Sequence, residues 1–268
     1  MQIIIFPGES RPSGMCWLWT LLEGLLRGNR YIKGCRRDSG EMRMTDFVAI
    51  VLAGGENLRL PHLKSELLVG GEILIRRITL SLLSLFKDIL IVVDEDKLDY
   101  LEKLMYSFGR SVKLVSDVVG PKCPLRGLYS GLLYSPAKFN FLVGCDMPFL
   151  QRELISYMAR RISRTDILIP RTGKFLEPLH AFYSSRCLHS IEKVLGKGEK
   201  KMVSFFPYVE VEYLEREEIA IFDSQGISFF NINTIDDWKK AIEIEKKRGK
   251  QQYGREYSQV ANITELQR

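Results

Sequence analysis

Short apolar runs and longer amphipathic segments alternate along most of the chain. An apolar run bounded by Gly, Pro or polar residues is typical of a strand, whereas apolar residues that recur at helical spacing predict a helix. This pattern predicts strands over residues 48–52, 66–69, 89–93, 112–115, 141–143, 167–170, 181–183 and 209–213, with a further extended segment near Phe230. It predicts helices over residues 73–86, 98–107, 125–134, 152–161 and 187–195.

This alternation also predicts the class of fold. Strands that are separated by helices usually run in the same direction, so they form a mostly parallel sheet with helices on both faces. The run Val48–Leu52 has no polar position, which is typical of a strand buried on both faces. We therefore expect a three-layer α/β/α, Rossmann-like fold, and we find no internal repeat.

The first residues do not follow this pattern. They contain the apolar run Met15–Leu26, which is too short to span a bilayer and is interrupted by Glu23. Basic residues follow the run, so a helix on a membrane surface is one interpretation, but neither a signal peptide nor stable membrane insertion is indicated. We divide the chain into an N-terminal extension over 1–44, a domain over 45–245 and a polar, basic tail over 246–268.

Composition and charge narrow the class of protein. With 268 residues and 46% hydrophobic residues, the chain is long enough for one sizeable α/β core. Its formal charge of +6 suits nucleic acid or a small anionic substrate, but no nucleic-acid motif is present, so we expect no nucleic-acid partner. The five cysteines are scattered without a C-x-x-C pair, which argues against a zinc site and a disulfide framework.

The most informative segment follows the first predicted strand. Gly54 and Gly55 come shortly after the apolar run, and Arg59 and Lys64 follow them. A loop without Cβ atoms lets backbone N–H groups approach phosphate oxygens, and two cations add charge that suits a nucleoside triphosphate. A tight strand-to-helix turn would explain the glycine pair alone equally well. The loop is neither a Walker A motif nor a G-x-G-x-x-G fingerprint.

A carboxylate follows another predicted strand. Asp146 lies just past residues 141–143, and Pro148 stops any continuation of the ladder. Ligands of open α/β sheets bind beyond the carboxyl ends of the strands. A carboxylate there is suited to Mg²⁺, which combines few protein carboxylates with water and phosphate oxygens. The alternative is that Asp146 only caps the helix that follows.

Six short motifs follow one another over roughly residues 47–238. They are Leu52–Gly55 with Arg59 and Lys64, Ser116–Asp117 with Pro124–Gly127, Cys145–Pro148, Glu177–Ala181, Gly198–Met202 and Phe230–Thr234. In this order they resemble the motifs of molybdenum cofactor guanylyltransferases, the MobA family. The resemblance implies a nucleotidyltransferase fold, and the Ala-Gly-Gly loop favours guanine over cytosine.

The resemblance implies transfer of GMP from GTP to the terminal phosphate of molybdopterin, which yields the guanine dinucleotide cofactor and pyrophosphate. A phosphate is already an adequate nucleophile near neutral pH, so positioning and charge neutralisation would carry the reaction. The resemblance further implies Mg²⁺, a cytoplasmic location, and transient contact with the cofactor insertion proteins or molybdoenzymes that receive the product.

The nucleotide-binding roles also follow from the resemblance. Backbone groups of Leu52, Ala53 and Gly54 would contact the guanine or ribose, and Gly55 with Arg59 would hold the triphosphate.

The remaining roles concern charge. Lys64 would offset charge that develops near the α-phosphate, because Lys is a compact point charge. Asp146 would bind Mg²⁺, and Asp117 matches the nucleoside-contacting Asp of the family. Asp94 stands where the family often has Asn, and a solvated loop acid beside Glu95 is the alternative for it.

Other residues would bind the acceptor, molybdopterin. Asn231 and Asn233 alternate along an extended segment, so they would face the same side and could hydrogen-bond a pterin edge. They could equally cap a helix that begins near Ile235, where Thr234 and Asp237 resemble a capping box. Further candidates are Arg126, His180, Lys200 and Lys201. A structural histidine and a solvated charge run are the alternatives for the last three.

The chain departs from the family pattern in the glycine loop and in the Pro124–Gly127 motif. Pro61 removes one backbone N–H, Leu63 replaces a carboxylate beside Lys64, and Arg126 adds a cation. Two other functions therefore stay open. One is a nucleotidyltransferase with another nucleotide or acceptor, of the CTP:molybdopterin or sugar-phosphate type. The other is a catalytically weakened protein that binds GTP or the cofactor.

The family pattern begins near Phe47, which bears on the N-terminal extension. Met42 or Met44 is a plausible start of translation, in which case residues 1–41 would come from an overlong gene prediction. We assign no function to the extension.

Overall fold

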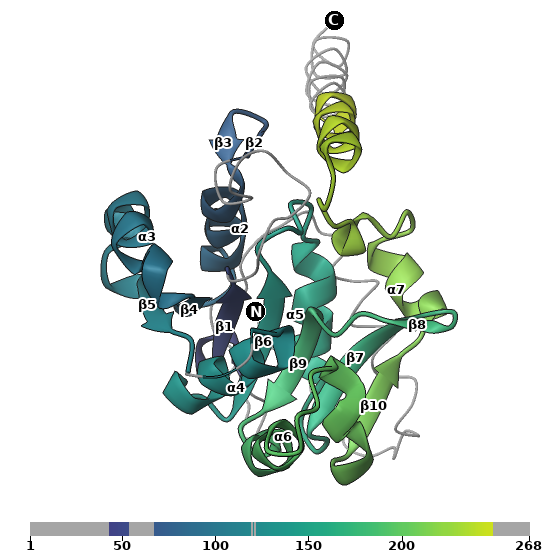
Figure 1. The fold of residues 1–268 in the computed structure, drawn as a ribbon. Helices are drawn as coiled ribbons and strands as arrows, with labels where there is room; N and C mark the ends of the chain where they lie inside the picture. Colours follow the sequence, from purple (N-terminus) through teal and green to yellow (C-terminus); the bar gives the residue numbers. More distant parts are fainter. Residues whose placement is uncertain (1–42, 54–66, 119, 121, 249–268) are drawn as a thin grey trace, which may run out of the picture. The chain divides into compact units, whose positions relative to one another are not determined.

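The computed structural model describes residues 43–53, 67–118, 120 and 122–248. The chain separates into two units, Met1–Glu41 and Met42–Arg268, and every described residue lies in the second. This second unit is built on one large sheet with helices against both faces (Figure 1). Among its described helices, none combines the length and the apolar character needed to cross a bilayer.

Eight of the described strands form the main sheet, and two form a separate hairpin. The strands are β1 (Phe47–Leu52), β2 (Leu68–Val69), β3 (Glu72–Ile73), β4 (Asp88–Val93), β5 (Val112–Ser116), β6 (Phe139–Gly144), β7 (Ile167–Thr172), β8 (Phe175–Leu176), β9 (His180–Ser184) and β10 (Val211–Leu214). The main sheet has the order β10-β7-β9-β6-β1-β4-β5, with β8 beside β7. β8 and β9 run antiparallel to their neighbours, so the sheet is mostly parallel, as predicted.

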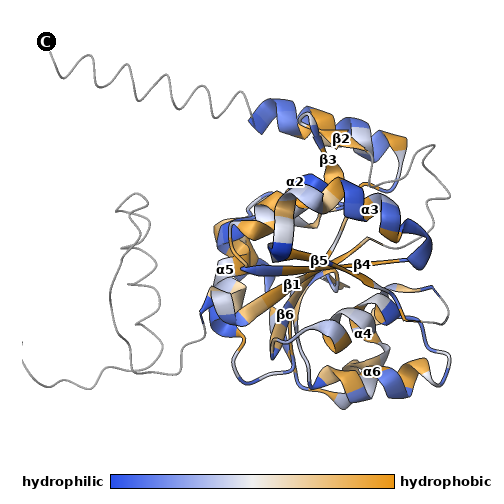
Figure 2. Ribbon diagram, turned by 90° about the vertical axis from the view of Figure 1, so that its left-hand side faces the viewer, coloured by the Kyte–Doolittle hydropathy of each residue, from blue (hydrophilic) through white to orange (hydrophobic). Residues whose placement is uncertain are grey.

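Helices cover both faces of this sheet, which makes the fold a three-layer α/β/α arrangement, as predicted. The helices are α2 (Leu74–Leu83), α3 (Leu98–Met105), α4 (Pro124–Tyr134), α5 (Arg152–Arg161), α6 (Cys187–Leu195), α7 (Arg216–Phe222) and a C-terminal helix over residues 235–248. The 3-10 segments are η1 (Met44–Asp46), η3 (Glu95–Lys97), η4 (Tyr106–Ser111), η5 (Met202–Tyr208) and η6 (Ile227–Phe229). Figure 2 shows α2, α3 and α5 on one face and α4 with α6 on the other.

The two helical layers explain why the central strands are apolar at every position. In β1, Ala49 and Val51 pack into the core below α2 and α5, whereas Val48 and Ile50 pack into the core formed with α4 and α6. All four side chains are buried. A strand with a core on both faces has no solvent-facing position, so it reads as a continuous apolar run.

The register of the sheet brings the ends of the central strands to one edge. Leu52 at the end of β1 pairs with Val92 in β4 and with Gly144 in β6. Val93 in turn pairs with Ser116 at the end of β5. The segments that follow these four strands therefore meet at the carboxyl edge of the sheet.

α4 packs closely against β1. A Cβ atom at Gly131 would lie 2.5 Å from Ile50 Cγ2, and one at Gly127 would lie 3.0 Å from Leu52 Cδ2. The two glycines therefore let the helix backbone approach the strand. This packing places the first turn of α4 beside the carboxyl end of β1.

The prediction of an extended strand near Phe230 is wrong. The chain forms η6 there, and residues 230–233 belong to no helix or strand. The cause is a local turn, in which the Asp223 carboxylate accepts the backbone N–H groups of Ile227 (3.1 Å) and Ser228 (2.7 Å). Gly226 precedes this turn with a φ of 65°, a conformation that favours glycine. The sequence pattern also gave no prediction for η5 and α7.

Candidate active site

Three carboxylates lie at the carboxyl edge of the sheet. Asp94 directly follows β4, Asp117 directly follows β5, and Asp146 comes shortly after β6. The Asp117 N–H donates to the Val93 carbonyl at 2.8 Å, so the sheet pairing continues into the segment that carries this carboxylate. The topology thus gathers acids from three separate chain segments.

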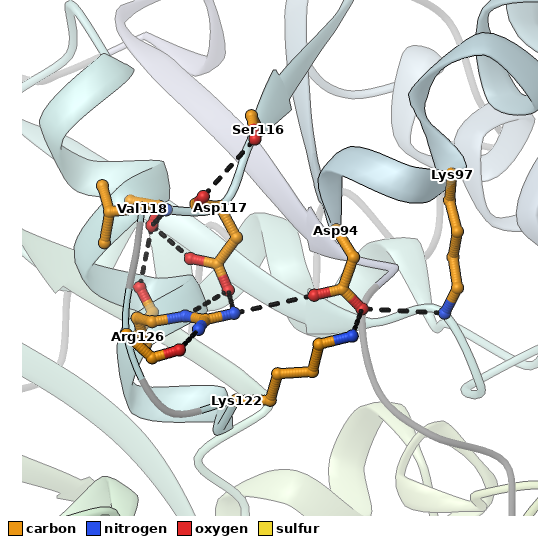
Figure 3. Close-up of polar contacts among 9 residues, drawn as sticks. Asp94, Lys97, Ser116, Asp117, Val118, Lys122 and Arg126 are labelled. Atoms are coloured by element: carbon orange, nitrogen blue, oxygen red, sulfur yellow. Dashed lines mark hydrogen bonds and ion pairs between the residues drawn. The ribbon is translucent and has the colours of Figure 1, made fainter.

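Arg126, in the first turn of α4, joins two of these carboxylates (Figure 3). Its Nε donates to Asp117 Oδ2 at 2.8 Å, and its Nη2 lies 2.6 Å from the same oxygen. Nη2 is also 3.6 Å from Asp94 Oδ1, and Nη1 donates to the Gly120 carbonyl. Arg126 and Asp94 are each only 6% exposed. The guanidinium therefore offsets the charge of two carboxylates that have left water, a cost that would otherwise be large.

Two lysines complete the charge balance around Asp94. Lys122 Nζ lies 3.2 Å from Asp94 Oδ2, and Lys97 Nζ lies 3.7 Å from it (Figure 3). Together, the two carboxylates and three cations have a formal charge of +1. This balance suits a negatively charged ligand better than a bare cation.

Ser130, one turn after Arg126 on α4, holds the second oxygen of Asp117. Its hydroxyl donates to Asp117 Oδ1 and accepts the Val118 N–H at 3.0 Å. One face of α4 thus fixes both oxygens of this carboxylate. Sequence reasoning missed Ser130, although its spacing of four residues from Arg126 was a signal. It also missed Lys97, although this residue lies only three positions after Asp94, and Lys122, whose approach to Asp94 depends on the tertiary fold.

Asp146 has a different environment. It is partly exposed, and its Oδ1 lies 2.5 Å from the position that a Cβ atom at Gly144 would take. The carboxylate therefore folds over the glycine that ends β6. The Asp146 carbonyl accepts the Ile232 N–H at 2.9 Å, which ties the segment after η6 to this loop.

The Asp146 carboxylate fits a divalent metal ion. It is an oxygen donor on a partly exposed residue past a strand end, and Mg²⁺ takes such a donor together with water and phosphate oxygens. In the described part of the chain, no group of three His, Cys, Asp or Glu side chains is placed to hold a metal ion. A metal ion at Asp146 would therefore need ligands beyond those side chains.

The glycine loop falls largely outside the described residues. The residues that are not described include Gly54, Gly55, Arg59 and Lys64. Their roles stay predictions. Leu52 and Ala53 are described, and the Ala53 N–H donates to the Val92 carbonyl at 2.9 Å while the Leu52 carbonyl accepts the Cys145 N–H at 3.1 Å. A nucleoside would have to meet other groups of these two residues.

Asn231 and Asn233 lie on either side of buried Ile232. The Ile232 N–H is bonded to the Asp146 carbonyl, so both asparagines are direct sequence neighbours of a residue that contacts the Asp146 loop. The Asn231 side-chain amide donates to the Phe229 carbonyl at 3.2 Å.

The helix that follows is capped by the predicted capping box. The Thr234 N–H donates to Asp237 Oδ2 at 3.0 Å, and the Asp237 N–H donates to Thr234 Oγ1 at 3.1 Å. These reciprocal bonds satisfy the first N–H groups of the helix. They lower the pKa of Asp237, the Thr234 hydrogen bond most of all.

His180, by contrast, is a packing residue. It is fully buried, and its ring lies edge-on to Phe141 and Phe229, with centroid distances of 5.0 and 5.1 Å. Neither ring nitrogen has a hydrogen-bond partner within the described residues. Burial lowers the pKa of His180 to about 3, so the ring is neutral. A ring in this position does not touch a bound substrate.

A cavity of about 400 Å³ lies between the first half of α4 and the end of α6. Arg126 and Lys200 both line it, together with Cys123, Tyr129 and Glu192. Two of the residues predicted to meet the acceptor therefore share one cavity. Lys201 is exposed and does not line this cavity.

A mostly parallel sheet with carboxylates past the ends of its central strands is the architecture of the nucleotidyltransferases, and it defines the class of this enzyme. Members of this class typically use a divalent metal ion. The model of the MobA-like NTP transferase domain matches residues 49–211, and the chain belongs to this family.

Relatives of known name cover most of the chain. A probable molybdenum cofactor guanylyltransferase of Pelotomaculum thermopropionicum is 32% identical over 200 residues, which are 74% of this chain and 93% of that protein. A molybdenum cofactor guanylyltransferase of Desulfosudis oleivorans is 30% identical over 74% of this chain and 95% of that protein. The crystal structure of molybdopterin-guanine dinucleotide biosynthesis protein A from Archaeoglobus fulgidus superposes with a TM-score of 0.65 at 29% identity, covering 75% of this chain and 99% of that one.

Proposed function

We propose that this protein transfers GMP from GTP to the terminal phosphate of molybdopterin, giving the guanine dinucleotide form of the cofactor and pyrophosphate. The observation that carries the proposal is the extent of the family match. It runs from β1 to the start of β10 and so includes the strand ends that carry Asp94, Asp117 and Asp146. The name shared by the relatives supplies the substrates.

The reaction needs position and charge more than acid–base chemistry. An oxygen of the acceptor phosphate forms a bond to the α-phosphorus of GTP, and the bond from that phosphorus to the β-phosphate oxygen breaks. The electron pair leaves with pyrophosphate. A phosphate oxygen near neutral pH needs no general base, so the protein would act by holding both substrates in line and by offsetting the charge that develops.

We assign the metal site to Asp146, with Mg²⁺ as the ion. Bound Mg²⁺ would act as a Lewis acid on phosphate oxygens. Asp146 itself would hold the ion at the carboxyl end of β6, because its carboxylate folds over Gly144 and reaches solvent. Arg59 and Lys64 would supply positive charge to the triphosphate, as the sequence predicts.

The nucleoside would lie at the ends of β1, β4 and β5. Asp94 and Asp117 offer oxygens that accept hydrogen bonds, and Arg126 already holds both carboxylates in place. The backbone at Leu52 and Ala53 would form the other side of this subsite.

The acceptor would enter from the side of the Asp146 loop. Asn231 and Asn233 belong to the segment that is bonded to this loop, so their amides are suited to the edge of a pterin. Arg126 and Lys200 share the α4–α6 cavity and could meet an anionic group. After transfer, the protein would hand its product to an insertion protein or molybdoenzyme by transient contact. We place these steps in the cytoplasm.

The decisive experiment is a turnover assay with molybdopterin and Mg²⁺ in which GTP, CTP, ATP and UTP are compared. Formation of the guanine dinucleotide and pyrophosphate from GTP alone is the expected result. Selective use of CTP would assign a sister activity. Tight GTP binding without turnover would instead favour a protein that binds GTP or the cofactor.

A further inference from the structure

Arg77, on α2, contacts three chain segments that are far apart in sequence. Its Nε donates to the Pro148 carbonyl at 3.1 Å, and its Nη1 donates to the Val69 carbonyl at 3.3 Å. Nη1 and Nη2 also form a bidentate pair with the carboxylate of Glu245, at 3.0 and 2.7 Å. The guanidinium further lies 5.7 Å from the centre of the Phe149 ring.

One of these contacts reaches the loop that carries a proposed catalytic charge, and another reaches the β2–β3 hairpin. Pro148 lies two residues after Asp146, the proposed metal ligand, and Val69 belongs to β2. A single planar guanidinium therefore fixes both segments through their backbone carbonyls. The guanidinium can hold several carbonyl groups at once because its N–H donors have fixed directions in one plane. The ammonium group of Lys lacks this geometry.

The C-terminal helix holds the guanidinium in place. Glu245 belongs to this helix, and Trp238 on the same helix donates from its indole Nε1 to the Leu68 carbonyl at 2.8 Å. The segment before the helix is bonded to the Asp146 carbonyl through the Ile232 N–H. The helix is thus fastened to both loops as well as to Arg77. Figure 2 shows it beside β2 and β3.

Gly70 shows how closely the pair is packed. A Cβ atom at this position would lie 2.8 Å from Glu245 Oε1 and 2.9 Å from Arg77 Nη1, and the φ of Gly70 is 65°. The β2–β3 turn therefore closes directly over the ion pair, and a glycine is required there.

We propose that Arg77 and Glu245 are positioning residues for nucleotidyl transfer, which rests on the proposed function. They hold the β2–β3 hairpin and the C-terminal helix against the loop of Asp146, so that the proposed metal ligand keeps its position beyond the end of β6. Neither residue touches a substrate. Their loss displaces the Asp146 carboxylate, and this slows the chemical step more than it weakens the binding of GTP.

The test compares the variants Glu245→Gln and Arg77→Lys with Arg76→Lys. Arg76 is a matched control, because it lies on the same helix with a similarly exposed side chain and pairs with Glu72 at 2.9 Å. Its other contacts go to Leu104 and Ser107, away from both loops. We expect kcat to fall by about tenfold in the first two variants, with the KM for GTP within about twofold of the wild type. Arg76→Lys should retain the wild-type kcat.

Hydrogen exchange measured by mass spectrometry on the full-length wild type and on Glu245→Gln gives a second readout that does not need turnover. Exchange should become faster both in residues 67–74 and in residues 147–155. Unchanged exchange in either segment overturns the proposal, and so does faster exchange with a wild-type kcat. If the wild type transfers no nucleotide, the proposed function fails, and the positioning role in transfer fails with it. The exchange data then still decide whether Arg77 and Glu245 couple the two loops.

Discussion

The two halves of the carboxyl edge are stabilised in different ways. At the ends of β4 and β5, Arg126 joins the buried Asp94 to Asp117, whose side chain is 12% exposed. At the end of β6, Asp146 is partly exposed, and the neighbouring β9 carries a neutral, apolar-packed His180. One half is therefore organised by charge and the other by packing.

This difference separates two tasks. Carboxylates that already have fixed counter-charges are suited to accept hydrogen bonds from a nucleoside at little reorganisation cost. A carboxylate that reaches solvent is suited to bind a cation that arrives with its substrate. The following variants test this division, from the largest expected effect to the smallest.

Asp146→Ala should reduce turnover by more than about 100-fold, because the metal ion would lose its protein ligand. Steady-state kinetics with Mg²⁺ and GTP measure the effect. Asp236→Ala is the control, since this carboxylate is 80% exposed on the C-terminal helix. Near-normal turnover of Asp146→Ala would contradict the metal assignment.

Arg126→Met should destabilise the protein by about 3 kcal/mol, since it leaves two nearly buried carboxylates without their shared partner. Urea unfolding measures this loss, and the KM for GTP should rise in parallel. Arg171→Met is the control, because the Arg171–Glu215 pair is 42% exposed on both sides and exposed pairs contribute little. Equal stabilities for the two variants would show that the cluster does not depend on its guanidinium.

His180→Leu should make the stability less sensitive to acid. The pKa of His180 is about 3 in the folded state and near its ordinary value of 6.5 when unfolded, so the unfolded state gains a proton first as the pH falls. Stability is then lost from pH 6.5 downwards by about 1.4 kcal/mol per pH unit. The unfolding free energy is measured at pH 6.5 and at pH 4.5. The decrease between these two pH values should be about 2–3 kcal/mol smaller in His180→Leu than in the wild type.

His189→Gln is the matched control for this measurement, because His189 is exposed on α6. The unfolding free energy of His189→Gln should change with pH in the same way as that of the wild type. If His180→Leu also follows the wild type, the buried ring is not the origin of the acid sensitivity.

Gly144→Ala should reduce turnover by about tenfold with little loss of fold, because the new methyl group would displace the Asp146 carboxylate. Asp236→Ala serves as the control here too, since this 80% exposed carboxylate lies on the C-terminal helix and lines neither proposed subsite. Equal rates for both variants would mean that the position of the Asp146 carboxylate over Gly144 is not important.

The sequence was sufficient to predict the elements that carry their own local signal. The apolar runs of β1 and β6 identify buried strands, and the run of β6 together with Pro148 was enough to place Asp146 past a strand end. The Thr234–Asp237 capping box was likewise visible in its spacing.

The remaining features depend on contacts between distant segments. Lys122 and Arg126 lie together around the start of α4, whereas Asp94 follows β4, and only the tertiary fold brings them together. The burial of His180 depends on Phe229, which no local pattern places above it. The glycine-loop residues Gly54, Gly55, Arg59 and Lys64 stay sequence predictions.

The indole of Trp238 offers an optical probe of the contact between the C-terminal helix and β2. The chain contains three tryptophans, and the other two, Trp17 and Trp19, lie in the N-terminal extension. Replacing both of these by Phe in the full chain would leave a single tryptophan, whose N–H is bonded to the Leu68 carbonyl. Its fluorescence should then report, in real time, each movement of the segment that follows the glycine loop when a nucleotide binds.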